Sequence, residues 1–254
     1  MNILSLRGIK GGVGTTTLVA NLAAAMRRMG RTVIVVDLCN DNLLRLLFSM
    51  PFADTAGWAP RLLAGDCALE AGYRSETGIH LLPFGRIDRQ GLDRLNAMIN
   101  QDPHWLAAML QPIDLPADSW LLLDCPVQNS ALTQQAEALA DQRLQVINAE
   151  PGCYALLAQQ DVMITHNPAA APNRLLINAF NPQRELDRNL HDLMRLENSD
   201  SLAPVVIHQD ETLREAFACM QTATDLAPQC QAVQDLQILA TWLFAQVVRK
   251  HRAA

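Results

Sequence analysis

A glycine-rich segment near the amino terminus carries the residue types that hold a phosphate group. It follows a short apolar run and precedes a helical pattern of apolar residues. Glycines allow the backbone to turn tightly with its N–H groups directed inward, and the helix that follows presents its positive amino-terminal end to an anion. Strand, glycine-rich turn and helix in this order are the context that a phosphate-binding loop requires. The segment predicts a nucleotide-phosphate site made of Lys10, Gly11, Gly12, Val13, Gly14, Thr15, Thr16 and Thr17.

Two apolar runs later in the chain end in carboxylates that can meet this loop. A β-branched run ends in Asp37, and a second apolar run ends in Asp124. Ligands of open parallel sheets bind outside the carboxyl ends of the strands, so both side chains are expected at the ligand edge. The Thr16 hydroxyl stands where such a loop supplies a Mg²⁺ ligand. We therefore expect Thr16 at a Mg²⁺ ion and both carboxylates at the edge where the ligand binds; the alternative for Asp37 is a plain strand end or helix cap.

The loop resembles that of the MinD/ParA family, whose usual form is K-G-G-x-G-K-[ST]-[ST]. The first lysine is present as Lys10, and Thr15 stands in place of the second. The family also has two acids after its second strand, one near Mg²⁺ and one near the attacking water. Asp37 matches the first acid, Cys39 stands where the second is expected, and Asp41 lies close by. The resemblance implies a Mg²⁺ site made of Thr16, Asp37 and Asp124, directly or through water, and the catalytic candidates Lys10, Asp37 and Asp41. The departures at Thr15 and Cys39 predict weak or absent nucleotide hydrolysis.

Strands that alternate with helices predict a mostly parallel sheet covered on both faces. The resemblance implies the same α/β fold, as a single P-loop NTPase domain over residues 1–254, with ATP and Mg²⁺ as ligands. In relatives, an Asn at the end of a strand forms hydrogen bonds with the edge of the adenine base, and Asn178 stands at the matching position. The alternative is that Asn178 only closes the strand into a turn. His208, where relatives flank the base, is either a pocket-lining or a structural residue.

Within that family the chain is similar to the group encoded with bacterial cellulose synthase, which shares the Thr15 and Cys39 departures. The resemblance implies an ATP-sandwiched homodimer in which Lys10 reaches across to the partner's phosphates. It also implies docking to a small helical companion protein and a cyclic-di-GMP-sensing subunit, and thereby an indirect association with the inner-membrane synthase complex. The matching segments are residues 11–17, 35–37, 41–46, 57–59, 81–85 and 176–178.

The composition limits the other classes of function. Half of the residues are apolar, 18% are charged, and the net charge of −6 comes without a long run of Lys or Arg, so no nucleic acid is expected. The six cysteines show neither a C-x-x-C pair nor zinc spacing. No apolar run reaches the roughly 18 residues of a membrane span, and the first residues form a strand pattern rather than a signal peptide. We expect a cytoplasmic protein that is peripheral at the inner membrane only through its partners.

The chain between the motifs gives further expectations. Residues 52–75 are expected to be irregular apart from a short helix at 58–63, and 203–207 is expected to form the last strand. A Pro/Ala-rich tract at 167–173 predicts a loop. Three aromatic side chains are expected in the core or in an interface, namely Trp58, Phe84 and Trp105.

Two functions fit these residues. The first is an ATP-binding assembly or regulatory subunit of the cellulose synthase secretion system, in which the nucleotide orders a dimer. The alternative is an active MinD/ParA-type ATPase that cycles on a membrane or the nucleoid for positioning or partition. The final helix, about 232–250, bears on that alternative: it is apolar on two faces, which favours core packing, while its basic end would also suit a membrane-binding helix.

Overall fold

Seven strands form one sheet in the part of the chain that the structure describes, residues 1–163 and 171–253. The structure is a computed structural model. The strand order is β3-β4-β2-β5-β1-β6-β7, and neighbours pair in parallel except for the antiparallel edge pair β3–β4. This arrangement confirms the mostly parallel α/β sheet expected from the sequence. The strands span Asn2–Gly8 (β1), Val33–Asp37 (β2), Tyr73–Arg74 (β3), His80–Leu82 (β4), Trp120–Cys125 (β5), Gln142–Asn148 (β6) and Asn173–Asn178 (β7).

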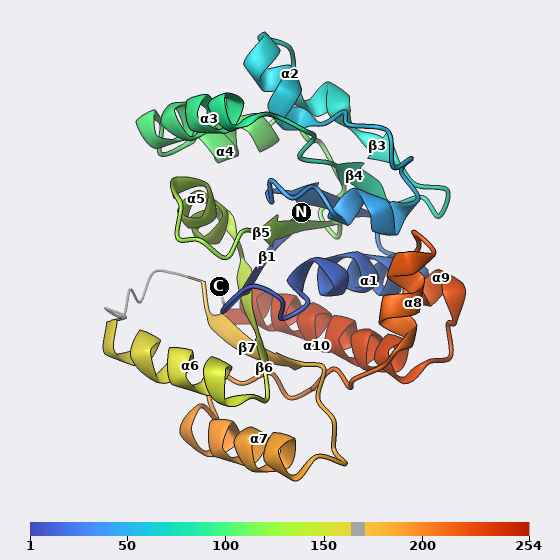
Figure 1. Cartoon of the computed structure of the whole chain (residues 1–254), viewed down its shortest axis with the longest axis vertical. Helices are drawn as coiled ribbons and strands as arrows, with labels where there is room; N and C mark the ends of the chain where they lie inside the picture. Colours follow the sequence, from blue (N-terminus) through green and yellow to red (C-terminus); the bar gives the residue numbers. More distant parts are fainter. Residues whose placement is uncertain (164–170, 254) are drawn as a thin grey trace.

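Helices cover both faces of this sheet (Figure 1). One face carries α3, α4 and α5, with α2 beside them, and the other carries α1 and α10; α6 and α7 lie beside β6 and β7. Two 3₁₀ helices, η1 and η2, follow β2 and α2. The bounds are Thr15–Arg28 (α1), Leu44–Phe48 (η1), Trp58–Ala64 (α2), Ala68–Ala71 (η2), Arg89–Gln101 (α3), Trp105–Leu110 (α4), Ala131–Leu139 (α5), Pro151–Met163 (α6), Glu185–Glu197 (α7), Thr212–Ala218 (α8), Ala223–Leu226 (α9) and Gln231–Ala253 (α10).

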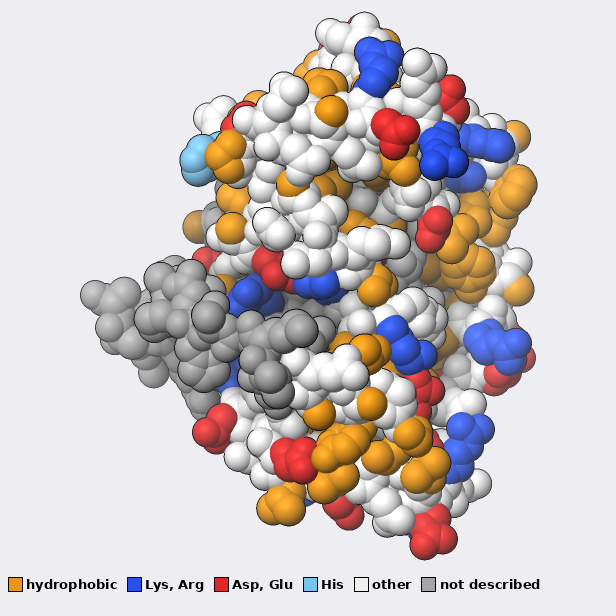
Figure 2. Space-filling view, turned by 60° about the vertical axis from the view of Figure 1, so that its left-hand side comes forward, with side chains coloured by type: hydrophobic (Ala, Val, Ile, Leu, Met, Phe, Trp, Pro, Cys, Tyr) orange, Lys and Arg blue, Asp and Glu red, His pale blue; other side chains and the backbone are white. Residues whose placement is uncertain are grey.

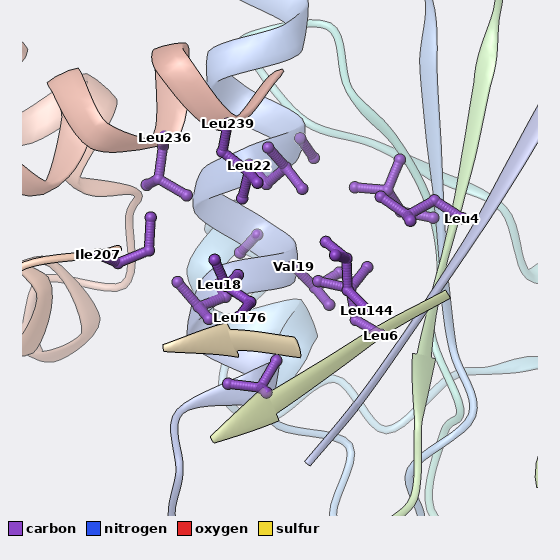
Figure 3. Close-up of a cluster of buried hydrophobic side chains, with 14 of the residues drawn as sticks. Leu4, Leu6, Leu18, Val19, Leu22, Leu144, Leu176, Ile207, Leu236 and Leu239 are labelled. Carbon is purple, nitrogen blue, oxygen red and sulfur yellow. The ribbon is translucent and has the colours of Figure 1, made fainter. Parts of the chain in front are cut away.

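The larger core fixes α1 between the sheet and α10 (Figure 3). Burial of each leucine in such a core contributes roughly 1.5–3 kcal/mol. Because α1 begins directly after the glycine-rich loop, this packing holds the loop against the carboxyl edge of the sheet. The fully buried side chains at this junction include Leu4, Leu6, Leu18, Leu22, Leu236 and Leu239.

The second core contains the three aromatic residues singled out in the sequence. Trp58 packs edge-to-face on Phe84, with ring centroids 4.8 Å apart, and lies 5.6 Å from Trp105. Its indole N–H donates a hydrogen bond to the backbone oxygen of Asp37 at 2.8 Å. Trp58 is therefore a core residue that also anchors the carboxyl end of β2.

The expectation for residues 52–75 was wrong in part, because this segment also contains η2 and β3. A tight turn joins β3 to β4: Ser75 N–H donates to Ile79 O, and Gly78 adopts a φ of 83° that favours glycine. The hairpin extends the sheet by one short strand. The tract 167–173 lies mostly outside the described residues.

The expected strand at 203–207 is not regular. The segment runs beside β7, where Ala203 N–H donates to Leu175 O and Ile207 N–H donates to Ile177 O, but only isolated bridges form. Pro204 has no N–H to contribute to a ladder, which accounts for the interruption.

The final helix buries one apolar face rather than two. Leu236, Leu239 and Leu243 are fully buried, whereas 57% of Ile238 is exposed and Trp242 is half-buried. The described part of α10 thus packs in the core, as expected, but its second face meets solvent. Within residues 1–163 and 171–253, no helix combines the length and the apolar character that a bilayer crossing requires.

Candidate nucleotide and metal site

The glycine-rich loop connects β1, which ends at Gly8, to α1, which begins at Thr15. Gly12 and Gly14 have φ values of 81° and 90°, a backbone conformation that other residues rarely adopt. A Cβ atom on Gly14 would also lie 2.5 Å from the Asn178 amide nitrogen. The loop therefore requires glycine for its curvature at two positions and for a close approach at one of them.

Asn178 ties the end of β7 to this loop. Its Nδ2 donates to the Val13 backbone oxygen at 2.7 Å, and its own backbone oxygen accepts from Asn148 Nδ2 at 2.9 Å. The remaining polar atom, Asn178 Oδ1, is buried and has no hydrogen-bond partner. The side-chain amide of Asn178 therefore donates to the loop through Nδ2, and its Oδ1 is available to accept a hydrogen bond.

Asp37 and Asp124 lie side by side at the ends of β2 and β5, where they are register partners. Both side chains are fully buried. Asp37 Oδ1 accepts a hydrogen bond from the Cys39 backbone N–H at 2.9 Å, but Asp37 Oδ2 and both carboxylate oxygens of Asp124 have no hydrogen-bond partner. Burial of carboxylate oxygens without hydrogen-bond partners is unfavourable in free energy, and a bound cation can compensate for it.

Burial raises the pKa of both carboxyl groups. Desolvation is the main cause for Asp37, whose pKa is raised well above its ordinary value, and the charge of Asp124 adds to it. Desolvation likewise raises the pKa of Asp124 to about 7. The Thr16 hydroxyl, which is nearby but does not meet hydrogen-bond geometry, lowers this pKa in part. A cation at this edge would reverse the effect, because a positive charge favours the ionised form of both groups.

Cys39 completes the cluster, since one ligand atom each of Asp37, Cys39 and Asp124 lies within 4.8 Å of the others. The Cys39 thiol donates to the Asp124 backbone oxygen at 3.6 Å, and burial raises its pKa well above the ordinary value. The thiol is therefore neutral at pH 7 and a poor ligand in that form. The other donors are hard oxygen atoms of Asp37, Asp124 and Thr16, a set that fits Mg²⁺.

Lys10 forms an ion pair within its own chain. Its Nζ lies 2.8 Å from Glu150 Oε1, and both side chains are more than one-third exposed. An exposed pair of this kind contributes little to stability, so Lys10 is readily available for another partner. Glu150 was not predicted from the sequence, because it lies far away along the chain and reaches Lys10 only through the pairing of β1 with β6.

A pocket of about 370 Å³ opens beside the loop at the carboxyl ends of β6 and β7. His208 lines it, as one interpretation of the sequence expected, and also has a structural role, because its Nδ1 lies 2.9 Å from Asp235 Oδ2. Asp41 is exposed; its charge helps to raise the pKa of Asp37, which places it near the carboxylate pair. Further lining residues include Gly12, Val13, Gly14, Thr17, Asn148 and Asn178.

Comparison with known proteins places this geometry in a family. Residues 1–244 match the family model described as cellulose biosynthesis protein BcsQ. The BcsQ protein of Escherichia coli K12 is 32% identical over 249 residues, covering 95% of this chain and 94% of the relative. The BcsQ protein of Salmonella typhi is 35% identical over 243 residues, with the same coverage of both chains.

Solved structures show the same fold. The septum site-determining protein MinD of Pyrococcus horikoshii, solved in complex with Mg-ADP, superposes with a TM-score of 0.72 and 25% identity, covering 95% of each chain. The sheet and the loop described above are thus those of a MinD/ParA-like ATPase fold. Because residues 1–244 match the BcsQ family model and two of its members are 32% and 35% identical over nearly the whole chain, the chain belongs to the BcsQ family of cellulose biosynthesis proteins.

Proposed function

We propose that this protein is a Mg²⁺- and ATP-binding, dimeric assembly or regulatory subunit of the bacterial cellulose synthase secretion system, with weak or absent hydrolysis. The observation that carries the proposal is the buried pair Asp37–Asp124, which has three unpartnered carboxylate oxygens next to a phosphate-binding loop. A pair of buried like charges is unfavourable without a cation. Mg²⁺ bound with ATP supplies that charge.

Each part of the candidate site has a role in this proposal. The backbone N–H groups of residues 10–17 and the start of α1 hold the phosphates. Thr16, Asp37 and Asp124 hold Mg²⁺, directly or through water, and the ion neutralises phosphate charge. Asn178 Oδ1, the unpaired acceptor, receives a hydrogen bond from the 6-amino group of adenine. Guanine has an oxygen at that position, so the same acceptor disfavours GTP.

Weak hydrolysis follows from two side chains. Thr15 has no charge to stabilise the transferred phosphoryl group, and Cys39 is a neutral thiol where the family has an acid. Charge stabilisation and orientation of the attacking water each lower the barrier by several kcal/mol in related reactions. ATP therefore acts mainly as a structural ligand.

Dimerisation and docking complete the proposal. In the dimer, Lys10 leaves Glu150 and reaches the phosphates bound to the partner, which supplies the positive charge that Thr15 lacks. The ordered dimer then docks to a small helical companion protein and a cyclic-di-GMP-sensing subunit, in the cytoplasm and next to the inner-membrane synthase. On the face shown in Figure 2, Lys and Arg side chains lie in several separate places among acidic ones, which supports protein partners rather than nucleic acid.

The test measures association and phosphate release on the same protein with Mg-ATP. Sedimentation velocity is expected to show dimers with Mg-ATP and monomers with Lys10→Ala, because only the dimer uses Lys10. Phosphate release is expected to stay near the level of the Thr16→Ala variant. Brisk release that Thr16→Ala abolishes would contradict the proposal and favour the alternative, an active ATPase of the MinD/ParA type that cycles on a membrane or the nucleoid.

A further inference from the structure

A second pocket, of about 300 Å³, lies at the opposite end of α1 from the phosphate-binding loop. α1 has 14 residues, which corresponds to a helix about 21 Å long. The β3–β4 turn and α9 complete the pocket, and α9 lies beside α1 in Figure 1. This pocket is therefore distinct from the candidate nucleotide site. It is lined by Ala24, Arg27, Arg28, Thr77, Ile79, Thr224 and Asp225.

Both arginines of this pocket lack an acidic partner in the described part of the chain. Among the residues that the structure describes, no ion pair involves Arg27 or Arg28. Arg28 makes one long contact, from Nη1 to the backbone oxygen of Thr224 at 3.5 Å. Their position in the last turn complements the helix dipole, which accounts for positive charge at this end of α1. It does not account for a pocket between the two guanidinium groups and the β3–β4 turn.

The Arg27 head group lies against the β3–β4 turn, although Arg27 is an exposed residue. A Cβ atom on Gly78 would lie 3.2 Å from Arg27 Nη2 and 3.3 Å from Arg27 Nε, so the guanidinium lies against the face of the glycine. Gly78 also has a φ of 83°, which disfavours any other residue. The guanidinium thus lies at the wall of the pocket, where its five N–H groups can donate to a ligand.

The other polar lining residues are two threonines and one carboxylate, Asp225. The Thr77 hydroxyl shares a hydrogen bond with Ser75 Oγ at 3.1 Å and is exposed toward solvent. Thr224 is 5% exposed, and its hydroxyl has no hydrogen-bond partner. Asp225 already accepts a hydrogen bond from the Thr222 hydroxyl at 2.6 Å and pairs with neither arginine. Two unpaired guanidinium groups near threonine hydroxyls have the chemistry that recognises a phosphate group.

We propose that Arg27, Arg28 and Thr77 bind a phosphate group, carried either by a small phosphorylated ligand or by a lipid headgroup. Arginine is suited to this role because its planar fork makes two parallel hydrogen bonds to one phosphate. The site does not depend on the nucleotide pocket, and the proposal is independent of the function proposed above.

The test titrates inorganic phosphate into the full chain in the presence of Mg²⁺ and a non-hydrolysable ATP analogue, with binding followed by ³¹P NMR line broadening. Arg27→Gln combined with Arg28→Gln is expected to weaken phosphate binding at least tenfold. Arg31→Gln is the matched control, because Arg31 is already engaged with Asp118 at 3.0 Å and with the Phe244 ring. Phosphate held at the glycine-rich loop is the same in all variants and cancels in the comparison.

A second pair of substitutions controls for loss of binding that is caused by misfolding. Arg27→Lys with Arg28→Lys keeps the charge at the helix end but loses the planar fork, and it is expected to weaken binding severalfold. Binding to vesicles of phosphatidylcholine with and without phosphatidic acid distinguishes a phosphate group on a small ligand from one on a lipid headgroup. Arginine-dependent binding of phosphate alone assigns a small ligand, and arginine-dependent binding only of vesicles with phosphatidic acid assigns a lipid headgroup. Equal binding by all variants, absence of both interactions, or a preference for a poly-glutamate peptide over phosphate would overturn the proposal.

Discussion

Asp37 and Asp124 are paired across neighbouring strands with three of their four carboxylate oxygens unpartnered and no exposure to solvent. Such a pair is unfavourable in the protein alone, and it becomes favourable when a cation lies at the edge of the sheet. The free energy of unfolding should therefore respond strongly to pH, to Mg²⁺ and to the loss of either carboxyl group.

The first prediction concerns pH without nucleotide or Mg²⁺. The pKa of Asp124 is about 7 in the folded protein and has an ordinary value of 3.8. The folded protein therefore holds a proton that the unfolded chain has lost, so stability falls as the pH rises between these two values. Asp124→Asn removes this loss and should raise the free energy of unfolding at pH 8 by between about 1 and 4 kcal/mol, with little effect at pH 4.

Urea denaturation at the two pH values measures this effect. Asp118→Asn, at an exposed carboxyl group paired with Arg31, serves as the control and should change stability little at either pH. Equal changes in the free energy of unfolding for the two substitutions would show that burial of the carboxylate pair does not destabilise the protein at high pH.

The second prediction is a gain of hydrolysis. Thr15→Lys with Cys39→Asp restores the charge on the phosphates and the acid near the attacking water, so ATP turnover should rise at least tenfold, which corresponds to about 1.4 kcal/mol of barrier. Phosphate release under single-turnover conditions measures the rate. Adding Thr16→Ala to the double variant should abolish the gain. A double variant that binds ATP but turns over no faster would show that the slow hydrolysis has another cause.

The third prediction concerns base selection by Asn178. Asn178→Ala removes both the donor to Val13 O and the unpaired acceptor, so ATP binding should weaken about tenfold and the preference for ATP over GTP should narrow. Competition against a fluorescent nucleotide measures both quantities. Asn173→Ala, at the exposed start of the same strand, is the control. An unchanged ATP/GTP ratio in Asn178→Ala would exclude the base-reading role.

The fourth prediction separates the two faces of α10. Leu239 is fully buried against α1, and Leu239→Ala should lower the free energy of unfolding by about 2–5 kcal/mol. Its neighbour Ile238 is 57% exposed, and Ile238→Ala should cost less than about 1 kcal/mol. Chemical denaturation of the two variants checks the difference. Comparable small losses would mean that α10 is not part of the core.

The sequence predicts those parts of the site that depend on local residues. The curvature of the loop needs Gly12 and Gly14, and the carboxylates at the ends of β2 and β5 follow from hydrophobic runs that stop at an acid. Contacts between distant segments were not predicted. The Trp58 indole reaches the Asp37 backbone, and the Asn178 amide reaches Val13, 165 residues away, through the packing of the whole sheet.

The structure of short or irregular segments also could not be predicted from the sequence patterns. The short pairing of β3 with β4 involves only two residues of β3, too few for a recognisable alternation. In α10 both faces contain apolar residues, and only the packing against α1 shows which face is buried. Hydrophobic periodicity indicates that a helix has an apolar face, but it does not identify the elements that cover it.

Whether ATP is a structural ligand can be measured from the nucleotide that survives purification. The protein is purified without added nucleotide and denatured, and the supernatant is separated by anion exchange. We expect intact ATP at about one molecule per chain, because a slowly hydrolysed ATP between two subunits is protected from exchange. ADP in its place, or an empty site, would contradict the claim that ATP is a structural ligand.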